Sequence, residues 1–482
     1  MVSHSVYIGP ATGLLPLLAK FMKCRSVPRM GLRSSPRSGG KGFIVKAVST
    51  RSAALVKCVA TAGEGFPDAM IDLVADPLDP SRLKLLLWDG AKAKIAPRIK
   101  YDRHTYEPVT LDPTVVRGVR WPTRSSDCGR TRDLFDRILR LVTENTGIAP
   151  QPAQLLVYFI FSTWFPDRLT VAPGLAIMGS AVAQAIQLLR FLQCACRRSM
   201  LLVGGPQLDL MSLPLSLYPS LLIDRPTLTC SLRGFLSASN RRGMVSVRRG
   251  KLLGVCCPKA VYFGLSEVPE AVACGMLQIT LPPVGVLPQV LEDEKANEIA
   301  AELQNKLLAY RLANFAKIRI SQLQGTSFTA QTHELAANLA ACVVGDPELA
   351  AGAVPLLKRR DEAVRAQRDR ELETVVIEAI LTVFHENKKD RVQVKEIATL
   401  ANSLLRCRGE FIQYSPEEVG HRLDLLALPR TRTAAGMCLT LTSDMRRLVH
   451  QLAHAYEVPS VANVVRSCPD CNAASGPAPA TV

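Results

Sequence analysis

Two cysteines and two histidines near the end of the chain have the types and spacing of metal ligands. Cys468 and Cys471 stand in "CPDC", which is the spacing of half a zinc site. His450 and His454 lie four residues apart, on one face of an expected helix. We expect two surface histidines and a pair of free thiols here, without a metal cofactor. A zinc site with two histidine and two cysteine ligands is the alternative that the spacing allows.

A second candidate site is the expected strand, turn and helix in "LAIMGSAVAQAIQLLRFL" (175–192). The phosphate-binding pattern at such a turn is G-x-x-x-x-G-K-[ST], in which backbone N–H groups and the Lys hold phosphate and Ser or Thr binds Mg²⁺. Aligned on Gly179, this chain has Gln184, Ala185 and Ile186 at the last three positions. The second glycine, the cation and the metal ligand are missing. We therefore expect no nucleotide cofactor, with weak binding of Mg-ATP as the alternative.

Further polar residues follow apolar segments downstream. Asp224 ends an expected strand (220–224), where a carboxylate could bind Mg²⁺, and Arg225 comes next. Residues 225–266 hold eight Lys and Arg and no acid, which predicts a basic hairpin before a strand that ends at Ser266. The hairpin cations expected to contact phosphates are Arg241, Arg242, Arg248, Arg249 and Lys251. A plain solvated hairpin is the alternative, and the hairpin offers no aromatic residue for stacking on bases.

The order of these features over residues 150–360 resembles the ATPase core of helicase-type P-loop proteins, including phage primase-helicases. The order is loop, acidic strand, basic hairpin, sensor strand and a helical segment with "LLAYRLANF". The resemblance implies nucleotide contacts at Gly179, Ser180, Asp224 and Ser266, and a hairpin directed at nucleic acid. In that family a catalytic acid usually stands where this chain has Arg225, so the resemblance implies a catalytically degenerate core, with Asp224 as the catalytic residue if it is active. An unrelated α/β domain with a chance Gly-Ser turn is the alternative.

The composition sets limits on the class of protein. The net charge of +17 predicts a polyanionic partner, for which we expect DNA, with an anionic membrane surface as the alternative. Residues 1–60 contribute ten Lys and Arg without any acid. A hydrophobic content of 48% excludes wholesale disorder. The apolar run 155–164 is about half the roughly 20 residues that span a bilayer, so we expect no membrane association. The 14 scattered cysteines are typical of reduced thiols in a cytoplasmic protein.

Common hydrolase motifs are lacking. The chain has no G-x-S-x-G and no H-E-x-x-H, and the histidines in "THEL" and "FHEN" look isolated. We therefore expect a protein without catalytic activity.

The fold class that we expect is α/β, with a mostly parallel, P-loop NTPase-like sheet. Its candidate strands are short apolar runs that alternate with helical patterns between residues 150 and 290. The expected domains are a disordered basic tail (1–40), a small β-rich region (41–125), the degenerate P-loop-like core (126–290), a helical lid (291–365), a winged-helix domain (366–458) and a tail with CxxC (459–482).

The last domain resembles a winged helix because helix, strand, helix, helix and hairpin patterns follow one another. Ser415 and Pro416 are suited to begin the third helix. That helix carries several acids, which makes it a poor surface for phosphates. Arg430 and Arg432 in the hairpin, the expected wing, are better placed to contact nucleic acid.

These observations predict a nucleic-acid-binding protein with a regulatory or accessory role and without ATP hydrolysis. Two alternatives stay open. The first is an active ATP-dependent DNA-remodelling enzyme, and the second is a protein-interaction scaffold that does not bind nucleic acid. An oligomer and a protein partner are both compatible with the sequence.

Overall fold

The structure is a computed structural model that describes most of the chain. The described residues are 58–203, 213–237, 240–248, 251–265, 268, 272, 275–282, 290–321, 323, 327–368, 371–386, 390–410, 412–434, 436–456, 458 and 468. The expected tail 1–40 lies outside them, as do Arg249, Ser266 and Cys471. Among the helices that are described, none is long and apolar enough to cross a membrane.

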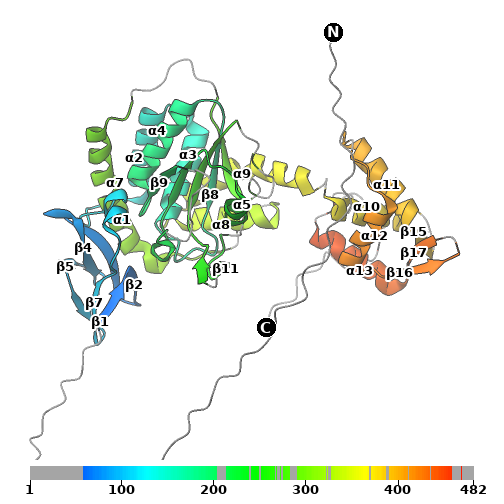
Figure 1. Ribbon diagram of the computed structural model, residues 1–482, viewed down its shortest axis with the longest axis horizontal. Coiled ribbons are helices and arrows are strands. Elements are labelled where there is room, and N and C mark those ends of the chain that lie inside the picture. The colour runs from blue at the N-terminus through cyan, green and yellow to red at the C-terminus, as the bar shows by residue number, and fades with distance from the viewer. Residues whose placement is uncertain are drawn as a thin grey trace, which may run out of the picture. The chain divides into compact units, whose positions relative to one another are not determined.

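Short strands form the first part of the described chain (Figure 1). They are β1 (Cys58–Thr61), β2 (Gly63–Gly65), β3 (Met70–Asp76), β4 (Asp79–Trp88), β5 (Ala93–Ala96), β6 (Ile99–Tyr101) and β7 (His104–Pro108). One sheet has the order β2-β3-β4-β5 and is antiparallel, and a second has the order β1-β7-β6. Ile71, Leu85 and Tyr106 contribute to a core under these strands, against which the helix α1 (Pro113–Gly118) also packs.

Two helices lead from this region to the central sheet. α2 (Thr131–Thr146) buries Phe135, Ile138 and Val142 along one face, as its apolar spacing dictates. Gly147 ends this helix in a left-handed conformation, with its N–H bonded to the carbonyl of Thr143. α3 (Pro150–Thr163) is apolar on nearly all sides, and it is buried from Leu155 onward. A helix of that composition belongs inside the molecule.

The central sheet confirms the predicted parallel architecture. Its strands are β8 (Gly174–Met178), β9 (Met200–Val203), β10 (Leu221–Asp224), β13 (Lys259–Gly264) and β14 (Met276–Thr280). They lie in the order β14-β8-β13-β10-β9, and every neighbouring pair is parallel. β13 separates β8 from β10, so the strand that carries Asp224 is not adjacent to the strand that leads into the Gly-Ser turn.

Helices cover both faces of this sheet (Figure 1). Leu175 and Ile177 of β8 point into a core shared with α2, α3 and α4 (Val182–Ala195), whereas Ala176 faces α5 (Cys230–Ser237). The downstream helices are α7 (Asp293–Asn314), the short η2 (Phe315–Lys317), α8 (Ala330–Ala341) and α9 (Pro347–Arg368). α7, α8 and α9 contribute to the core of α2–α4 as well, so the helices predicted as a lid share a hydrophobic core with the sheet.

A short hairpin lies within the segment predicted to be basic. It pairs β11 (Val245–Arg248) with β12 (Lys251–Gly254) in antiparallel register, and Arg248 stands opposite Lys251. The 3-10 turn η1 (Leu215–Leu217) precedes β10.

The last part of the chain has a hydrophobic core of its own, which includes Ile380, Ile397 and Val449. Its elements are α10 (Leu372–Glu386), β15 (Arg391–Gln393), α11 (Val394–Cys407), α12 (Pro416–Leu425), β16 (Arg430–Thr433), β17 (Gly436–Thr440) and α13 (Ser443–Ala455). The three strands form an antiparallel sheet with β17 in the middle. Ser415 begins α12 with a reciprocal capping box to Glu418.

A buried charge network ties the N-terminal strands to the core. The carboxylate of Asp72 on β3 lies 2.9 Å from Arg197, 2.6 Å from Arg198 and 3.0 Å from Arg311. Burial raises the pKa of Asp72, but the three guanidinium groups outweigh this effect and hold it well below its usual range. Arg311 on α7 also binds Asp167 at 2.5 Å. The network therefore fixes the chain just after α4 against both β3 and α7.

Candidate functional site

The turn between β8 and α4 is too short to enclose a phosphate. β8 ends at Met178 and α4 begins at Val182, so Gly179, Ser180 and Ala181 alone connect them. A phosphate-binding loop places four residues between its two glycines before the helix carries the Lys. In this chain the helix has already begun where the middle of that loop would lie.

Gly179 serves the packing of the sheet. Its φ of 120° suits glycine, and a Cβ at this position would lie 2.1 Å from the carbonyl oxygen of Leu281. Its N–H donates to the carbonyl of Gly264 at 2.9 Å, and its own carbonyl accepts from the Tyr262 hydroxyl at 3.0 Å. Gly179 is therefore needed for close contact with the segment after β14, and its N–H already has a partner within the chain.

The three positions aligned with the phosphate-binding residues lie near the start of α4. Ala185 has no exposed surface, and Gln184 is buried with its amide donating to the carbonyl of Thr146 at 2.9 Å. Ile186 is 38% exposed. A Lys at position 185 would point into the hydrophobic core and away from a phosphate at the turn.

Asp224 and Arg225 pair with each other at the carboxyl end of the sheet. Two hydrogen bonds of 3.1 and 3.2 Å join the guanidinium to the two carboxylate oxygens. This pairing raises the pKa of Arg225 above its ordinary value. The two residues lie at the same strand end as the β8–α4 turn, where Gly179, Ser180, Arg225 and Tyr262 line a pocket of about 440 Å³. The pocket thus presents a cation next to an already paired carboxylate, and Ser266 falls outside the described residues.

Several cations of the basic segment 225–266 have partners inside the protein. Arg241 binds Glu334 at 2.7 Å, and Arg242 donates to the carbonyl of Asp167 at 2.9 Å. Lys259 is completely buried, donates to Asn240 and to the carbonyl of Val255, and lies 4.3 Å from the ring centre of Phe235. The pair Arg248 and Lys251 marks the end of the hairpin.

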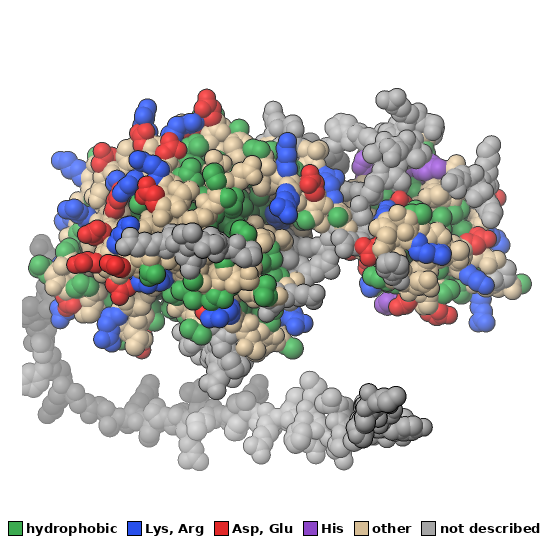
Figure 2. Space-filling view, turned by 90° about the horizontal axis from the view of Figure 1, so that it is seen from above, with side chains coloured by type: hydrophobic (Ala, Val, Ile, Leu, Met, Phe, Trp, Pro, Cys, Tyr) green, Lys and Arg blue, Asp and Glu red, His purple; other side chains and the backbone are tan. Residues whose placement is uncertain are grey.

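Charges of both signs share the described surface. On the face shown in Figure 2, Lys and Arg side chains lie among Asp and Glu. In the sequence, residues 1–60 and 225–266 are the segments that hold Lys and Arg without any acid.

The two predicted arginines of the C-terminal hairpin differ. Arg430 forms two hydrogen bonds with the carboxylate of Asp424 on α12, at 3.0 and 2.5 Å. Arg432 is exposed and has no ion-pair partner within the described part of the chain. On α12 itself, Arg422 binds Glu373 at 2.8 Å. Of these cations, Arg432 is the one presented to solvent without a countercharge.

Two of the four candidate metal ligands, His450 and Cys468, lie close together in the structure. A third residue, His385, which looks isolated in the sequence, joins them. His450 Nε2 lies 3.4 Å from Cys468 Sγ, and His385 joins them so that the three ligand atoms lie within 4.8 Å of one another. His385 is the histidine of "FHEN". His454 is not part of this group, and Cys471 lies outside the described residues. His385 is far from Cys468 in the sequence, so no spacing pattern identifies it as a ligand. The sequence signal that could have prompted a search for it is "CPDC", which supplies half of a ligand set and so requires further ligands from elsewhere in the chain.

Comparison with known proteins finds distant structural likenesses alone. No family model and no curated protein matches the chain. A full-length MCM homolog from Methanopyrus kandleri is 13% identical, with 61% of this chain and 77% of that chain covered and a TM-score of 0.36. The C-terminal region of NrS-1 is 9% identical, with 77% and 97% covered and a TM-score of 0.31. A Drosophila ORC structure bound to DNA is 12% identical, with 68% and 93% covered and a TM-score of 0.17. At such low TM-scores these likenesses support no conclusion about the function of this chain.

Proposed function

We propose that this protein binds nucleic acid through its basic segments and does not hydrolyse ATP. The observation that carries nucleic-acid binding is the β11–β12 hairpin, whose register places Arg248 opposite Lys251 within a segment that contains no acid. Clustered cations without nearby carboxylates attract a phosphate backbone, and they need no particular spacing to do so. Arg249 lies between these two residues in the sequence and adds a third cation.

The absence of hydrolysis is supported by the β8–α4 turn. The N–H of Gly179 is bonded to Gly264, and the position aligned with the phosphate-binding Lys is the buried Ala185. Hydrolysis also needs a group that orients the attacking water, and the carboxylate of Asp224 is paired with Arg225 instead. The core is thus proposed to be a P-loop-like scaffold that has lost the use of its nucleotide site.

The C-terminal elements are proposed to form a winged-helix domain that contacts nucleic acid through its wing. In the usual arrangement the recognition helix enters the major groove. Here that helix would be α12, whose Asp424 and Arg422 are held in ion pairs with Arg430 and Glu373. The exposed Arg432 on β16 makes the hairpin β16–β17 the better surface for phosphate contact.

The test is fluorescence anisotropy of the full chain with single-stranded and duplex DNA at several salt concentrations. A variant with Arg248→Ala, Arg249→Ala and Lys251→Ala should bind weakly, with a salt dependence shallower by about three counterions. The matched control, Lys92→Ala, Lys94→Ala and Lys100→Ala, removes the same charge from exposed positions of the β-rich region. Equal losses in both variants would assign the binding to net charge alone and overturn the role of the hairpin.

A parallel titration with a fluorescent ATP analogue and Mg²⁺ tests the second half of the proposal. No saturable binding is expected at micromolar nucleotide, with or without DNA. Saturable binding together with turnover would overturn the proposal and identify an ATP-dependent enzyme.

A second candidate function is protein binding through the C-terminal domain. It is favoured by Leu425 at the end of α12, which is 60% exposed, and by Met437 on β17, which is 38% exposed. Retention of DNA binding in a Leu425→Ser variant that has lost a protein partner would separate the two functions.

A further inference from the structure

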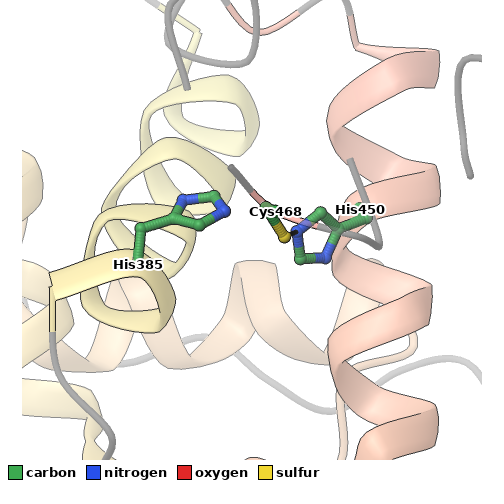
Figure 3. Close-up of side chains that lie close together, drawn as sticks. All are labelled: His385, His450 and Cys468. Atoms are coloured by element: carbon green, nitrogen blue, oxygen red, sulfur yellow. Dashed lines mark hydrogen bonds between the residues drawn. The ribbon is translucent and has the colours of Figure 1, made fainter. Parts of the chain in front are cut away.

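Three side chains from distant parts of the sequence converge in the C-terminal domain (Figure 3). His385 comes from the end of α10, His450 from α13, and Cys468 from the segment that follows α13. The imidazoles of His385 and His450 are nearly perpendicular, with ring centres 5.5 Å apart. The thiol of Cys468 lies by the ring of His450, as Figure 3 shows.

The ring of His450 is held in an orientation that suits a metal ligand. Its Nδ1 lies 2.6 Å from the carbonyl of Arg446, one turn earlier on α13, so Nδ1 carries the proton in the neutral ring and donates it. The lone pair is then on Nε2, which faces Cys468. Donation from the other ring nitrogen to a carbonyl is the usual outer support of a ligating histidine.

The surroundings are also those of a structural metal site. His450 is 4% exposed, and the ring of Phe384 stacks parallel to it at a centroid distance of 6.3 Å. Such an apolar wall excludes water and fixes the ligand in place.

The separation of the ligand atoms matches tetrahedral zinc. With Zn–S near 2.3 Å and Zn–N near 2.1 Å, the sulfur and nitrogen of a tetrahedral site lie about 3.6 Å apart. The observed distance between Cys468 Sγ and His450 Nε2 is 3.4 Å. A thiol–imidazole hydrogen bond gives a similar distance, but it does not require a second histidine within 4.8 Å.

We propose that His385, His450 and Cys468 bind a zinc ion that fastens the end of the chain to α10 and α13. Imidazole and thiolate ligands together select zinc among the common divalent ions of cells. This site goes beyond the proposed function, because none of its three ligands belongs to the β11–β12 or the β16–β17 hairpin.

The first test measures the zinc content of the purified full chain by elemental analysis after dialysis against a weak chelator. About one zinc per chain is expected, and His385→Ala and Cys468→Ser should each remove it. The matched controls are His454→Ala, one turn from His450, and Cys407→Ser, an exposed thiol at the end of α11, which should both retain zinc. An unaltered chain without zinc would overturn the proposal, and so would loss in His454→Ala with retention in His385→Ala.

The second test does not depend on how well the variants fold. Replacement of zinc by Co²⁺ in the unaltered chain should give the intense visible bands of a tetrahedral site and a thiolate-to-metal charge-transfer band. Weak bands typical of octahedral Co²⁺ would contradict the proposed geometry.

Discussion

The β8–α4 turn has a glycine and a carboxylate of the kind found at phosphate sites, and the His385–His450–Cys468 cluster has side chains of the kind that bind metals. The two regions differ in whether these groups are already bonded to other parts of the chain. At the turn, Gly179 bonds through its N–H and its carbonyl to other parts of the chain, and Asp224 is paired with Arg225. In the cluster, three ligand atoms face one another within 4.8 Å. A phosphate site needs backbone donors that are left unpaired, whereas a metal site needs side chains that converge. The first requirement is lost when a loop shortens, and the second can be met by residues far apart in sequence.

The helix α4, which follows the turn, is also held by contacts within the protein at both of its ends. At its start, Gly179 packs against Leu281, and after its end Arg197 and Arg198 bind Asp72. Groups held in this way contribute to stability and are not free to bind a ligand. Substitutions of these held groups and of the buried residues of α4 should therefore lower the stability of the protein without revealing a nucleotide site.

The largest effect is expected from Ala185→Lys, which places the missing cation of a phosphate loop in the chain. Ala185 has no exposed surface, so the long side chain must displace its neighbours and bury an ammonium group. Overpacking costs roughly 2 kcal/mol, and an unpaired buried charge costs about 3 kcal/mol more. Urea unfolding should show a loss of about 5 kcal/mol, without any gain in binding of a fluorescent ATP analogue.

The control for this variant is Ile186→Lys, because the neighbouring residue is 38% exposed and can direct a cation into water. Its stability should change by less than about 1 kcal/mol. If Ala185→Lys were as stable as the unaltered chain and bound nucleotide, the conclusion that the β8–α4 turn cannot hold a phosphate would be wrong.

Asp72→Asn should have the next largest effect, because it leaves Arg197, Arg198 and Arg311 buried without their common carboxylate. A loss of about 4 kcal/mol in the free energy of unfolding is expected. Asp79→Asn, on the neighbouring strand, removes a half-buried carboxylate whose partner Arg82 is solvent-exposed, and it should cost less than about 1 kcal/mol.

The effect of Asp72→Asn depends on pH in a defined direction. The folded state holds the pKa of Asp72 below its unfolded value, so the stabilisation is complete above about pH 5. It is lost as the pH falls below about 4, towards the depressed native pKa. The difference between the two proteins in urea unfolding should therefore shrink on acidification, and a difference that grew instead would contradict the role of the carboxylate.

Gly179→Ala should destabilise the protein by about 3 kcal/mol. A Cβ would meet the Leu281 carbonyl at 2.1 Å, and the φ of 120° is strained for any other residue. Gly234 within α5 offers the opposite case, because a Cβ there meets nothing within 4 Å. Gly234→Ala should be neutral or stabilising by up to about 1 kcal/mol, as measured by urea unfolding. Equal stability of the two variants would mean that the turn is loose enough to open for a ligand.

The parallel sheet could be predicted because its strands are short apolar runs buried on both faces. The end of α2 at Gly147 and the start of α12 at Ser415 could be predicted too, since caps are local signals. The order of the strands in the sheet could not be predicted from local signals of this kind, because it depends on how distant segments pack.

The candidate sites were harder to predict for the same reason. The closed turn depends on the approach of Leu281, and the network of Asp72 depends on arginines more than a hundred positions away. His450 and Cys468 could be named from their spacing, but His385 could not, because no spacing rule links a residue on α10 to the end of the chain.

The smallest effect is expected from Arg225→Glu, which places an acid at the position where the sequence resemblance to helicase-type ATPases would put one. The Arg225 side chain is 52% exposed, so loss of its pair with Asp224 should change stability by no more than about 1 kcal/mol. Catalysis should not appear, because a carboxylate can orient water only if the phosphate is already held, and the turn at Gly179 has too few residues to hold it. Phosphate release from Mg-ATP, with DNA present, should stay at the level of a buffer blank for the variant and for the unaltered chain. ATP hydrolysis by the variant alone would mean that this turn binds nucleotide in spite of its length, and that the missing acid is all that separates the core from an active enzyme.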